Sequence, residues 1–235
     1  MSELTIHDPD DGVVLAELDR PPGNLFTLDV CRELTSLLQS PPEGAHVLRL
    51  RTAGDAFCLG RERGGATPAE VRTEAQVLAE VMRALRRTRL VTVVEVQGDA
   101  AGFGVGLVAA CDVSVALDTA RFSFPEVGIG LAPALVLAWL PRVVGEREAF
   151  WLTATGEAIP AARAARLGLV NSVVSSTDEL RAHSDERVSA LRSRSPRVHA
   201  DIKDMLRVFA EVGDDAALDV SIDRLVVGSL RRSEG

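Results

Sequence analysis

Tyrosine is absent from the 235-residue sequence, so any mechanism that uses a tyrosine as acid or base is excluded. Only three cysteines occur, Cys31, Cys58 and Cys111, and no two of them form a CxxC pair. A sparse, odd set of this kind is typical of free thiols in a reducing compartment and not of a disulfide framework. The four histidines are scattered, without the spacing of metal ligands, so we expect no metal site.

Long hydrophobic runs and an excess of positive charge are lacking as well. The longest apolar stretches, such as 131–140, are too short to span a bilayer, and we expect no membrane partner. The chain begins Met-Ser-Glu-Leu, without the basic and apolar segments of a leader, which together with the free thiols predicts a cytoplasmic protein. The formal net charge of −8 disfavours non-specific nucleic-acid binding, so no nucleic-acid partner is expected.

What is present is enough apolar sequence for a full core. With 46% hydrophobic residues, one large domain over 1–235 fits better than two small ones. Residue patterns in the first half predict alternating elements. Strands are expected at 13–19, 46–52, 91–97 and 113–117, and helices at 28–39, 67–88 and 103–110. This alternation predicts an α/β layered fold.

The second half of the chain is mainly helical in pattern. Helices are expected at 146–154, 160–167, 177–192, 196–212 and 215–230, with one further strand at 169–174. We divide the domain into a core of about residues 1–190 and a C-terminal helical region of about 191–235. This half carries more amphipathic helix than one small sheet can cover, which predicts association of several copies.

Two turns that contain glycine follow expected strands and open toward helices. They are Asp-Ala-Phe-Cys-Leu-Gly-Arg-Glu at 55–62 and Gly-Asp-Ala-Ala-Gly-Phe-Gly-Val-Gly at 98–106. Missing side chains let a ligand approach the backbone, and a helix that begins near Phe103 directs its free N–H groups at the turn. Two converging backbone donors can hold an oxyanion. For either turn alone, tight packing of helix on strand is the favoured explanation of the glycines.

A third segment, 120–133, contributes one acid. Glu126 follows Pro125 and is bracketed by apolar residues, so full exposure of its side chain is not expected. The alternative to a functional role is that Glu126 is an ordinary solvated acid after a proline, which is a common surface pattern. The order of the three segments decides between the two interpretations.

Together these segments resemble the crotonase superfamily, the family of enoyl-CoA hydratases and isomerases. The family's F-C-A-G-x-D/E turn is matched by residues 57–62. Its G-x-A-x-G-G-G turn, with a helix that ends in C-D, is matched by 98–112. Its F-x-x-P-E and G-x-x-P motifs are matched by 122–133.

The resemblance covers about residues 10–210 and implies a fold and an assembly. The fold is a spiral of ββα repeats with C-terminal helices that build homotrimers, often stacked as hexamers. The C-terminal region of about 191–235 is expected to be shorter than is usual in the family. The substrate implied is an acyl-CoA thioester, with no cofactor other than the coenzyme A of the substrate itself.

The resemblance also implies roles for individual residues. Glu126 would be the catalytic carboxylate, and the backbone N–H groups of Arg61 and Phe103 would form the oxyanion hole, with Phe103 at a position where a glycine is usual. Contacts to acyl-CoA are implied for Arg20, Cys58, Leu59, Gly60, Gly102, Gly104 and Lys203. For Arg20, an ordinary solvated charge is an equally good interpretation.

One departure from the family pattern decides the expected reaction. Hydratases of the family use two carboxylates, and the position of the first falls here on Gly106, which leaves Glu126 alone. A lone glutamate suits a proton shuttle from the α to the γ carbon of the thioester, so isomerisation is favoured over hydration. General acid–base catalysis of this kind typically raises the reaction rate ~10²–10⁴-fold. Two alternatives stay open: a hydratase that uses Glu126 alone in two steps, and a non-catalytic acyl-CoA-binding protein.

Overall fold

The larger of two sheets forms the centre of the molecule. The computed structural model describes residues 3–233. Within them the larger sheet has the strand order β1-β2-β3-β5-β7-β10. These strands are β1 (Leu4–Ile6), β2 (Val13–Leu18), β3 (Val47–Thr52), β5 (Val91–Val96), β7 (Val113–Leu117) and β10 (Ser172–Val174). Only β1 pairs antiparallel with its neighbour, so the sheet needs crossover connections between its other strands.

The smaller sheet is built from short strands that follow the long ones. Its order is β4-β6-β8-β9, with β4 (Ala56–Cys58), β6 (Asp99–Ala101), β8 (Arg121–Ser123) and β9 (Ile159–Pro160). After β3, β5 and β7 the chain therefore steps from the larger sheet into the smaller one before it turns. Because β4, β6 and β8 run parallel, the turns that follow them lie at one edge of the smaller sheet.

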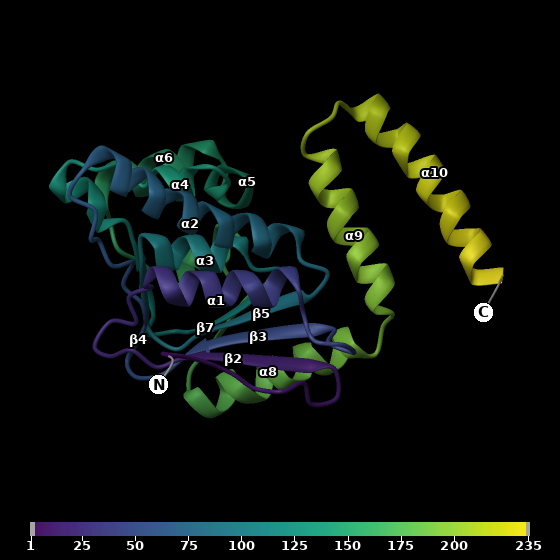
Figure 1. Ribbon diagram of the computed structural model, residues 1–235, viewed down its shortest axis with the longest axis horizontal. Coiled ribbons are helices and arrows are strands. Elements are labelled where there is room, and N and C mark those ends of the chain that lie inside the picture. The colour runs from purple at the N-terminus through teal and green to yellow at the C-terminus, as the bar shows by residue number, and fades with distance from the viewer. Residues whose placement is uncertain (1–2, 234–235) are drawn as a thin grey trace.

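Three helices cover one face of the larger sheet (Figure 1). α1 (Leu28–Gln39) is capped by Thr27, and α2 (Pro68–Arg87) begins with a capping box of Thr67 and Glu70. α3 (Phe103–Ala110) is buried along its whole length, because α2 lies on one side and the short strands on the other. This explains why its sequence is apolar on every face.

The remaining helices complete the body, and one of them, α8 (Thr177–Arg192), covers the opposite face of the larger sheet (Figure 1). The others are η1 (Pro125–Ile129), α4 (Ala134–Leu137), α5 (Leu140–Val144), α6 (Glu146–Thr155) and α7 (Ala161–Arg166). α8 lies under the sheet in Figure 1, where Val188 packs on Val47, Val91 and Val93. The sheet is therefore covered on both faces, as a mainly parallel sheet requires.

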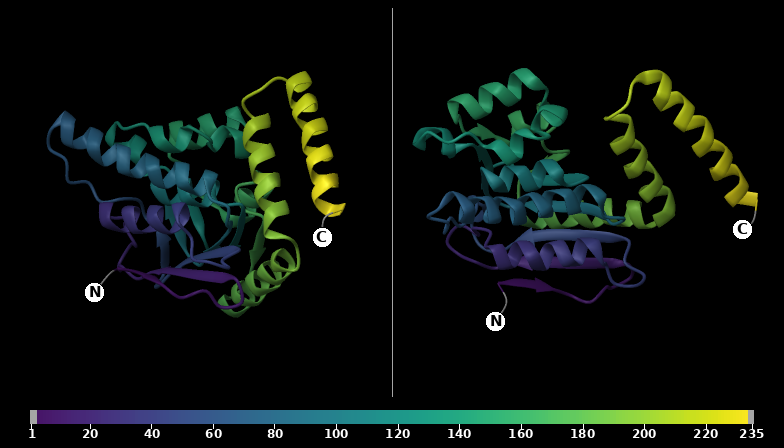
Figure 2. Two further views of the ribbon diagram at one scale, coloured as in Figure 1. Left: turned by 45° about the vertical axis from the view of Figure 1, so that its right-hand side comes forward. Right: turned by 45° about the horizontal axis from the view of Figure 1, so that its top comes forward.

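Helices α9 (Pro196–Phe209) and α10 (Asp214–Ser233) stand to one side of this body (Figures 1 and 2). α9 is attached by Lys203, whose Nζ donates to Asp112 Oδ2 at 2.6 Å, and by His199, whose ring stacks on His46 with Nδ1 2.9 Å from Nε2. Burial and the neighbouring His199 lower the pKa of His46. No helix in residues 3–233 combines the length and the apolar character that a bilayer-spanning segment needs.

The predicted alternation of strands and helices in the first half is confirmed. α1 and α8 occupy the expected residues, whereas α9 ends at Phe209, before the expected 212. The strand expected at 169–174 begins only at Ser172. The short strands β4, β6 and β8 were not predicted, and they are the elements that gather the turns.

Candidate active site

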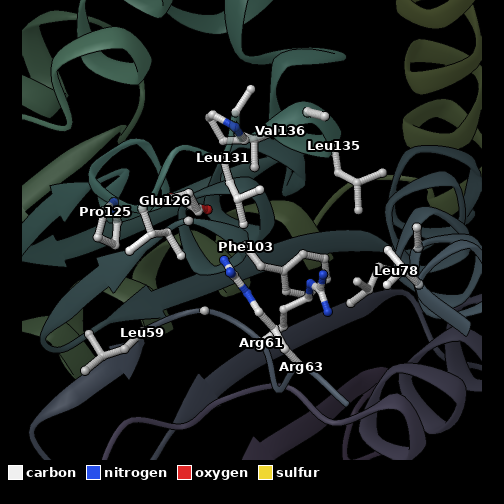
Figure 3. A pocket seen from close by; sticks show the side chains of 18 residues that line it. Leu59, Arg61, Arg63, Leu78, Phe103, Pro125, Glu126, Leu131, Leu135 and Val136 are labelled. Atoms are coloured by element: carbon white, nitrogen blue, oxygen red, sulfur yellow. The ribbon is translucent and has the colours of Figure 1, made fainter. Parts of the chain in front are cut away.

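The three turns at the edge of the smaller sheet open onto one cavity of about 540 Å³ (Figure 3). Arg61 follows β4, Phe103 follows β6, and Glu126 follows β8, and all three residues line it. The other lining residues are mostly apolar: Leu59, Gly60, Arg63, Val71, Ala75, Leu78, Gly102, Pro125, Ile129, Leu131 and 132–136. The structure therefore brings six of the ten predicted site residues to one place.

The first backbone donor is the N–H of Arg61. Arg61 forms a parallel bridge with Phe26, in which the Phe26 N–H donates to the Gly60 carbonyl at 3.1 Å and the Glu62 N–H donates to the Phe26 carbonyl at 3.0 Å. In such a pairing, the N–H of the residue between these two groups points to the opposite side. Among residues 3–233, no backbone carbonyl accepts from it, so it is free to bind a ligand.

The second donor is the N–H of Phe103, the first residue of α3. N–H groups in the first turn of a helix have no acceptor within the helix, and the helix dipole adds partial positive charge. A Cβ placed on Gly60 would lie 3.9 Å from the Ala101 carbonyl oxygen, so the two turns are neighbours. The Phe103 ring packs on Phe26, with 5.6 Å between centroids, and Figure 3 shows it directed away from Glu126.

The Glu126 carboxylate lies against the turn that carries the second donor. A Cβ built on Gly102 would lie only 2.2 Å from Glu126 Oε1, and Gly102 has φ 51° and ψ −112°, a backbone conformation that favours glycine. Glu126 Oε2 is buried and has no hydrogen-bond partner among the described residues. A buried carboxylate oxygen without a donor is costly unless a ligand supplies one. The arrangement can accept a proton from a molecule held by the two N–H groups.

Gly106 lies one turn along α3, where a side chain would be crowded by apolar neighbours. A Cβ there would meet Met82 Cε at 2.8 Å and Val136 Cγ2 at 3.0 Å. Apolar side chains from α2 and α4 thus occupy the space beside the position. Within the lining of this cavity, Glu126 is the only acid.

Cys58 and Gly104 lie behind the cavity wall. A Cβ on Gly104 would lie 2.2 Å from the Cys58 carbonyl oxygen, so the glycine lets α3 pack directly on β4. Burial raises the pKa of the Cys58 thiol to about 12, and its Sγ donates to the Gly60 carbonyl at 3.2 Å. Both residues hold the two turns together, and their predicted contact with acyl-CoA stays a prediction.

Arg20 and Lys203 are not brought to the cavity. The Arg20 guanidinium pairs with Glu3 at 2.8 Å and with Glu62, and these carboxylates raise its pKa. Lys203 donates to Asp112 and, at 2.7 Å, to the Leu90 carbonyl, at the far end of α3. Each cation thus already has acidic or carbonyl partners, and the predicted contacts with coenzyme A stay predictions.

Sequence reasoning missed Glu74, which fixes the first turn. This carboxylate is 9% exposed on α2 and accepts from Arg61 Nη1 and from the Gly64 N–H, both at 3.1 Å. It therefore holds the loop from which the Arg61 N–H projects. The signal for it in the sequence is an acid placed four residues before Leu78, on the face of the helix that carries the buried stripe.

Comparisons with known proteins agree with this geometry. The chain matches the family described as "Enoyl-CoA hydratase/isomerase" over residues 8–226. It is 33% identical to a probable enoyl-CoA hydratase of Rhodobacter capsulatus, over 76% of this chain and 72% of the relative. It is 31% identical to an enoyl-CoA isomerase/hydratase of Mycosarcoma maydis, over 73% and 70%.

The fold is also found among solved structures. An enoyl-CoA hydratase of Mycobacterium smegmatis superposes with a TM-score of 0.92 at 26% identity, and the match covers 97% of this chain and 91% of that one. The predicted α/β fold is thereby confirmed. Among residues 3–233, no three His, Cys, Asp or Glu side chains gather in a way that could hold a metal ion.

Proposed function

The chain belongs to the enoyl-CoA hydratase/isomerase family, and we propose that it moves the double bond of an enoyl-CoA thioester with Glu126 as its single proton carrier. The observation that supports this most is the Glu126 carboxylate against Gly102, with one oxygen free and no second acid in the cavity lining. One carboxylate can move one proton, whereas hydration needs an oriented water as well.

The thioester is held by its carbonyl oxygen. That oxygen accepts hydrogen bonds from the N–H groups of Arg61 and Phe103, which develop their full strength when the oxygen becomes an enolate. Each such donor typically contributes about 3 kcal/mol to lowering the barrier. Because both donors belong to the backbone, no side-chain substitution removes them directly.

Glu126 then transfers the proton. Its carboxylate takes a proton from the α carbon of a 3-enoyl thioester, and the C–H electrons form the dienolate. The protonated Glu126 returns the same proton to the γ carbon, where the C3=C4 π electrons form the new C–H bond. The enolate C1=C2 electrons move to C2=C3 and the oxyanion becomes a carbonyl again, which gives the 2-enoyl thioester. Atoms and charge balance without water or a cofactor.

The acyl chain has an apolar channel beside this centre. Val71, Ala75 and Leu78 on α2 line the cavity together with Ile129 and residues 131–136. Ile129 and Leu131 are 67% and 48% exposed, so the rim is apolar as well as the interior. An apolar chain is therefore preferred over a polar one next to the thioester.

The first test compares two reactions of the unmodified protein. With the same acyl chain, migration of the double bond in 3-enoyl-CoA is expected to be faster than hydration of 2-enoyl-CoA, because Met82 and Val136 fill the space beside Gly106. Both rates are measured by product mass on one enzyme sample. Efficient hydration with no migration would favour the hydratase alternative, which the names of the relatives suggest. Binding of acyl-CoA without either reaction would favour a non-catalytic protein.

The second test concerns assembly. We propose a trimer or hexamer, supported by the exposed apolar stripe Leu218, Ile222, Leu225 and Val226 on α10. Light scattering at micromolar concentration is expected to report such an assembly, and Ile222→Glu with Leu225→Glu is expected to reduce it to smaller species. Asp223→Ala, which changes an exposed acid of the same helix outside the apolar stripe, serves as the control. A stable monomer in the wild type would contradict the proposal.

The third test concerns Glu74 as a positioning residue. Glu74→Ala is expected to lower kcat by about tenfold with little change in KM, because the loop that carries the Arg61 N–H loses two hydrogen bonds. Glu74→Gln, which can still accept one of them, is expected to recover part of the loss. The control Glu80→Ala removes an exposed acid of the same helix. An equal rise in KM with unchanged kcat would assign Glu74 to ground-state binding instead.

A further inference from the structure

A second cavity, of about 380 Å³, lies at the opposite end of α3 from the first one. The residues Val91 and Val113, which begin β5 and β7, line it together with Ala109 and Ala110 at the end of α3. It shares no lining residue with the cavity of Glu126. Helix α9 forms its outer wall.

Positively charged side chains outnumber carboxylates in the lining of this cavity. Its lining contains Arg86, Lys203 and Arg207 but one carboxylate, that of Asp112. Asp112 is already engaged, because its Oδ2 accepts from Lys203 Nζ at 2.6 Å and from Thr92 N at 2.8 Å. The two arginines are left to face each other.

Arg86 and its neighbours hold donors without acceptors. Arg86 makes no hydrogen bond or ion pair with any described residue, and its guanidinium lies 5.9 Å from the centre of the Trp139 ring. Burial lowers the pKa of Arg86, and Arg142 and Arg207 add to this, whereas Asp112 and Glu211 oppose it.

Arg207, on the α9 side of the cavity, also has a donor without an acceptor. Arg207 donates to Asp204 at 3.2 Å, yet its Nε is buried and lacks an acceptor within the described residues. Trp139 Nε1, beside Arg86, is likewise buried and lacks an acceptor within the described residues. Arginine donors from α2 and α9 therefore line a cavity whose one carboxylate, Asp112, is already engaged by Lys203, in a chain whose net charge is −8.

We propose that this cavity binds a small organic carboxylate with a short apolar chain. The carboxylate lies between the guanidinium groups of Arg86 and Arg207, whose planar fork matches its two oxygens. The chain lies on the apolar part of the lining, which includes Ala109, Val143 and Leu206. This apolar floor favours an organic anion over inorganic phosphate, which would lose its hydration without compensation.

Binding there joins α2 to α9. Because the ligand contacts Arg86 on one helix and Arg207 on the other, it stabilises the attachment of the C-terminal helices to the body. The site does not depend on the reaction proposed for Glu126, since it lies at the other end of α3.

The test is calorimetric titration of the full-length protein with sodium octanoate, with butyryl-CoA present in excess to fill the first cavity. Arg86→Gln and Arg207→Gln are each expected to raise the Kd for octanoate at least tenfold. Arg86→Lys keeps the positive charge but loses the planar guanidinium, and it is expected to raise the Kd for octanoate several-fold. This variant tests the proposal even if Arg86→Gln fails to fold. Arg83→Gln, an exposed arginine on the same helix that pairs with Glu80, is expected to leave the Kd within twofold.

The outcomes separate cleanly. No binding of octanoate by the wild type, or binding with the same Kd in both glutamine variants, overturns the proposal. Inorganic phosphate that binds as tightly as octanoate and depends equally on Arg86 overturns the choice of an organic anion. A change in assembly caused by Arg86→Gln, without any octanoate binding, assigns the arginines to contacts between subunits instead.

Discussion

Glu126→Gln is expected to lower kcat for double-bond migration by ~10²–10⁴-fold while the affinity for acyl-CoA stays within a few-fold. The amide keeps the size of the carboxylate beside Gly102 but cannot take up a proton. The thioester still meets both N–H groups, because these belong to the backbone of Arg61 and Phe103. Turnover of 3-enoyl-CoA and equilibrium binding of a saturated acyl-CoA measure the two quantities on the same sample.

The matched control is Glu62→Gln. Glu62 belongs to the same turn as Arg61, but its carboxylate pairs with Arg20 and is not part of the cavity lining. Its replacement is expected to change kcat less than tenfold. If the Glu126 variant keeps most of its kcat while the Glu62 variant loses it, the proton carrier has been misassigned, and Glu62 takes its place.

Gly102→Ala is expected to lower kcat by about 10²-fold and to destabilise the fold by ~1–3 kcal/mol. The new Cβ would lie 2.2 Å from Glu126 Oε1 and 2.8 Å from its carboxyl carbon, so the carboxylate must move. The backbone at φ 51° and ψ −112° is also strained for any residue with a Cβ. Thermal unfolding reports the second effect and steady-state turnover at a temperature well below unfolding reports the first.

Gly128→Ala provides the comparison for this variant. Gly128 lies two residues from Glu126 in η1, its φ is not positive, and a Cβ built there meets nothing within 4 Å. Both kcat and stability are expected to stay near those of the wild type. Loss of activity in Gly128→Ala equal to that in Gly102→Ala would indicate that any change near η1 disturbs the site, and not the specific contact with the carboxylate.

The order of the three turns could be predicted from the sequence, because each turn is a local pattern. Glycines at 60 and 102 and the Pro125-Glu126 pair are short-range features, and their match to the motifs of the crotonase family is what points to Arg61, Phe103 and Glu126. The structure adds that these residues line one cavity. Strands β4, β6 and β8 bring them together, and at three residues each they are too short to produce an alternating pattern.

What could not be predicted depends on contacts between distant parts of the chain. Glu74 reads as one acid among several on a polar helix until its bonds to Arg61 and Gly64 are seen. Lys203, whose predicted contact with coenzyme A stays a prediction, donates to Asp112, 91 residues away in sequence, and this bond has no signal in the sequence. Such pairings follow from how α2 and α9 pack, which no local pattern contains.

The packing around Gly106 also limits the evolutionary paths open to this site. A carboxylate at position 106 would restore the two-acid pattern of the family's hydratases, yet its Cβ would meet Met82 and Val136 at 2.8 and 3.0 Å. The end of the Met82 side chain can turn aside, whereas the branched Val136 is stiffer, so a smaller residue at 136 would make the change at 106 easier. An acid at position 106 therefore requires Met82 and Val136 to give way, so the chemistry available at this position depends on the packing of its two neighbours.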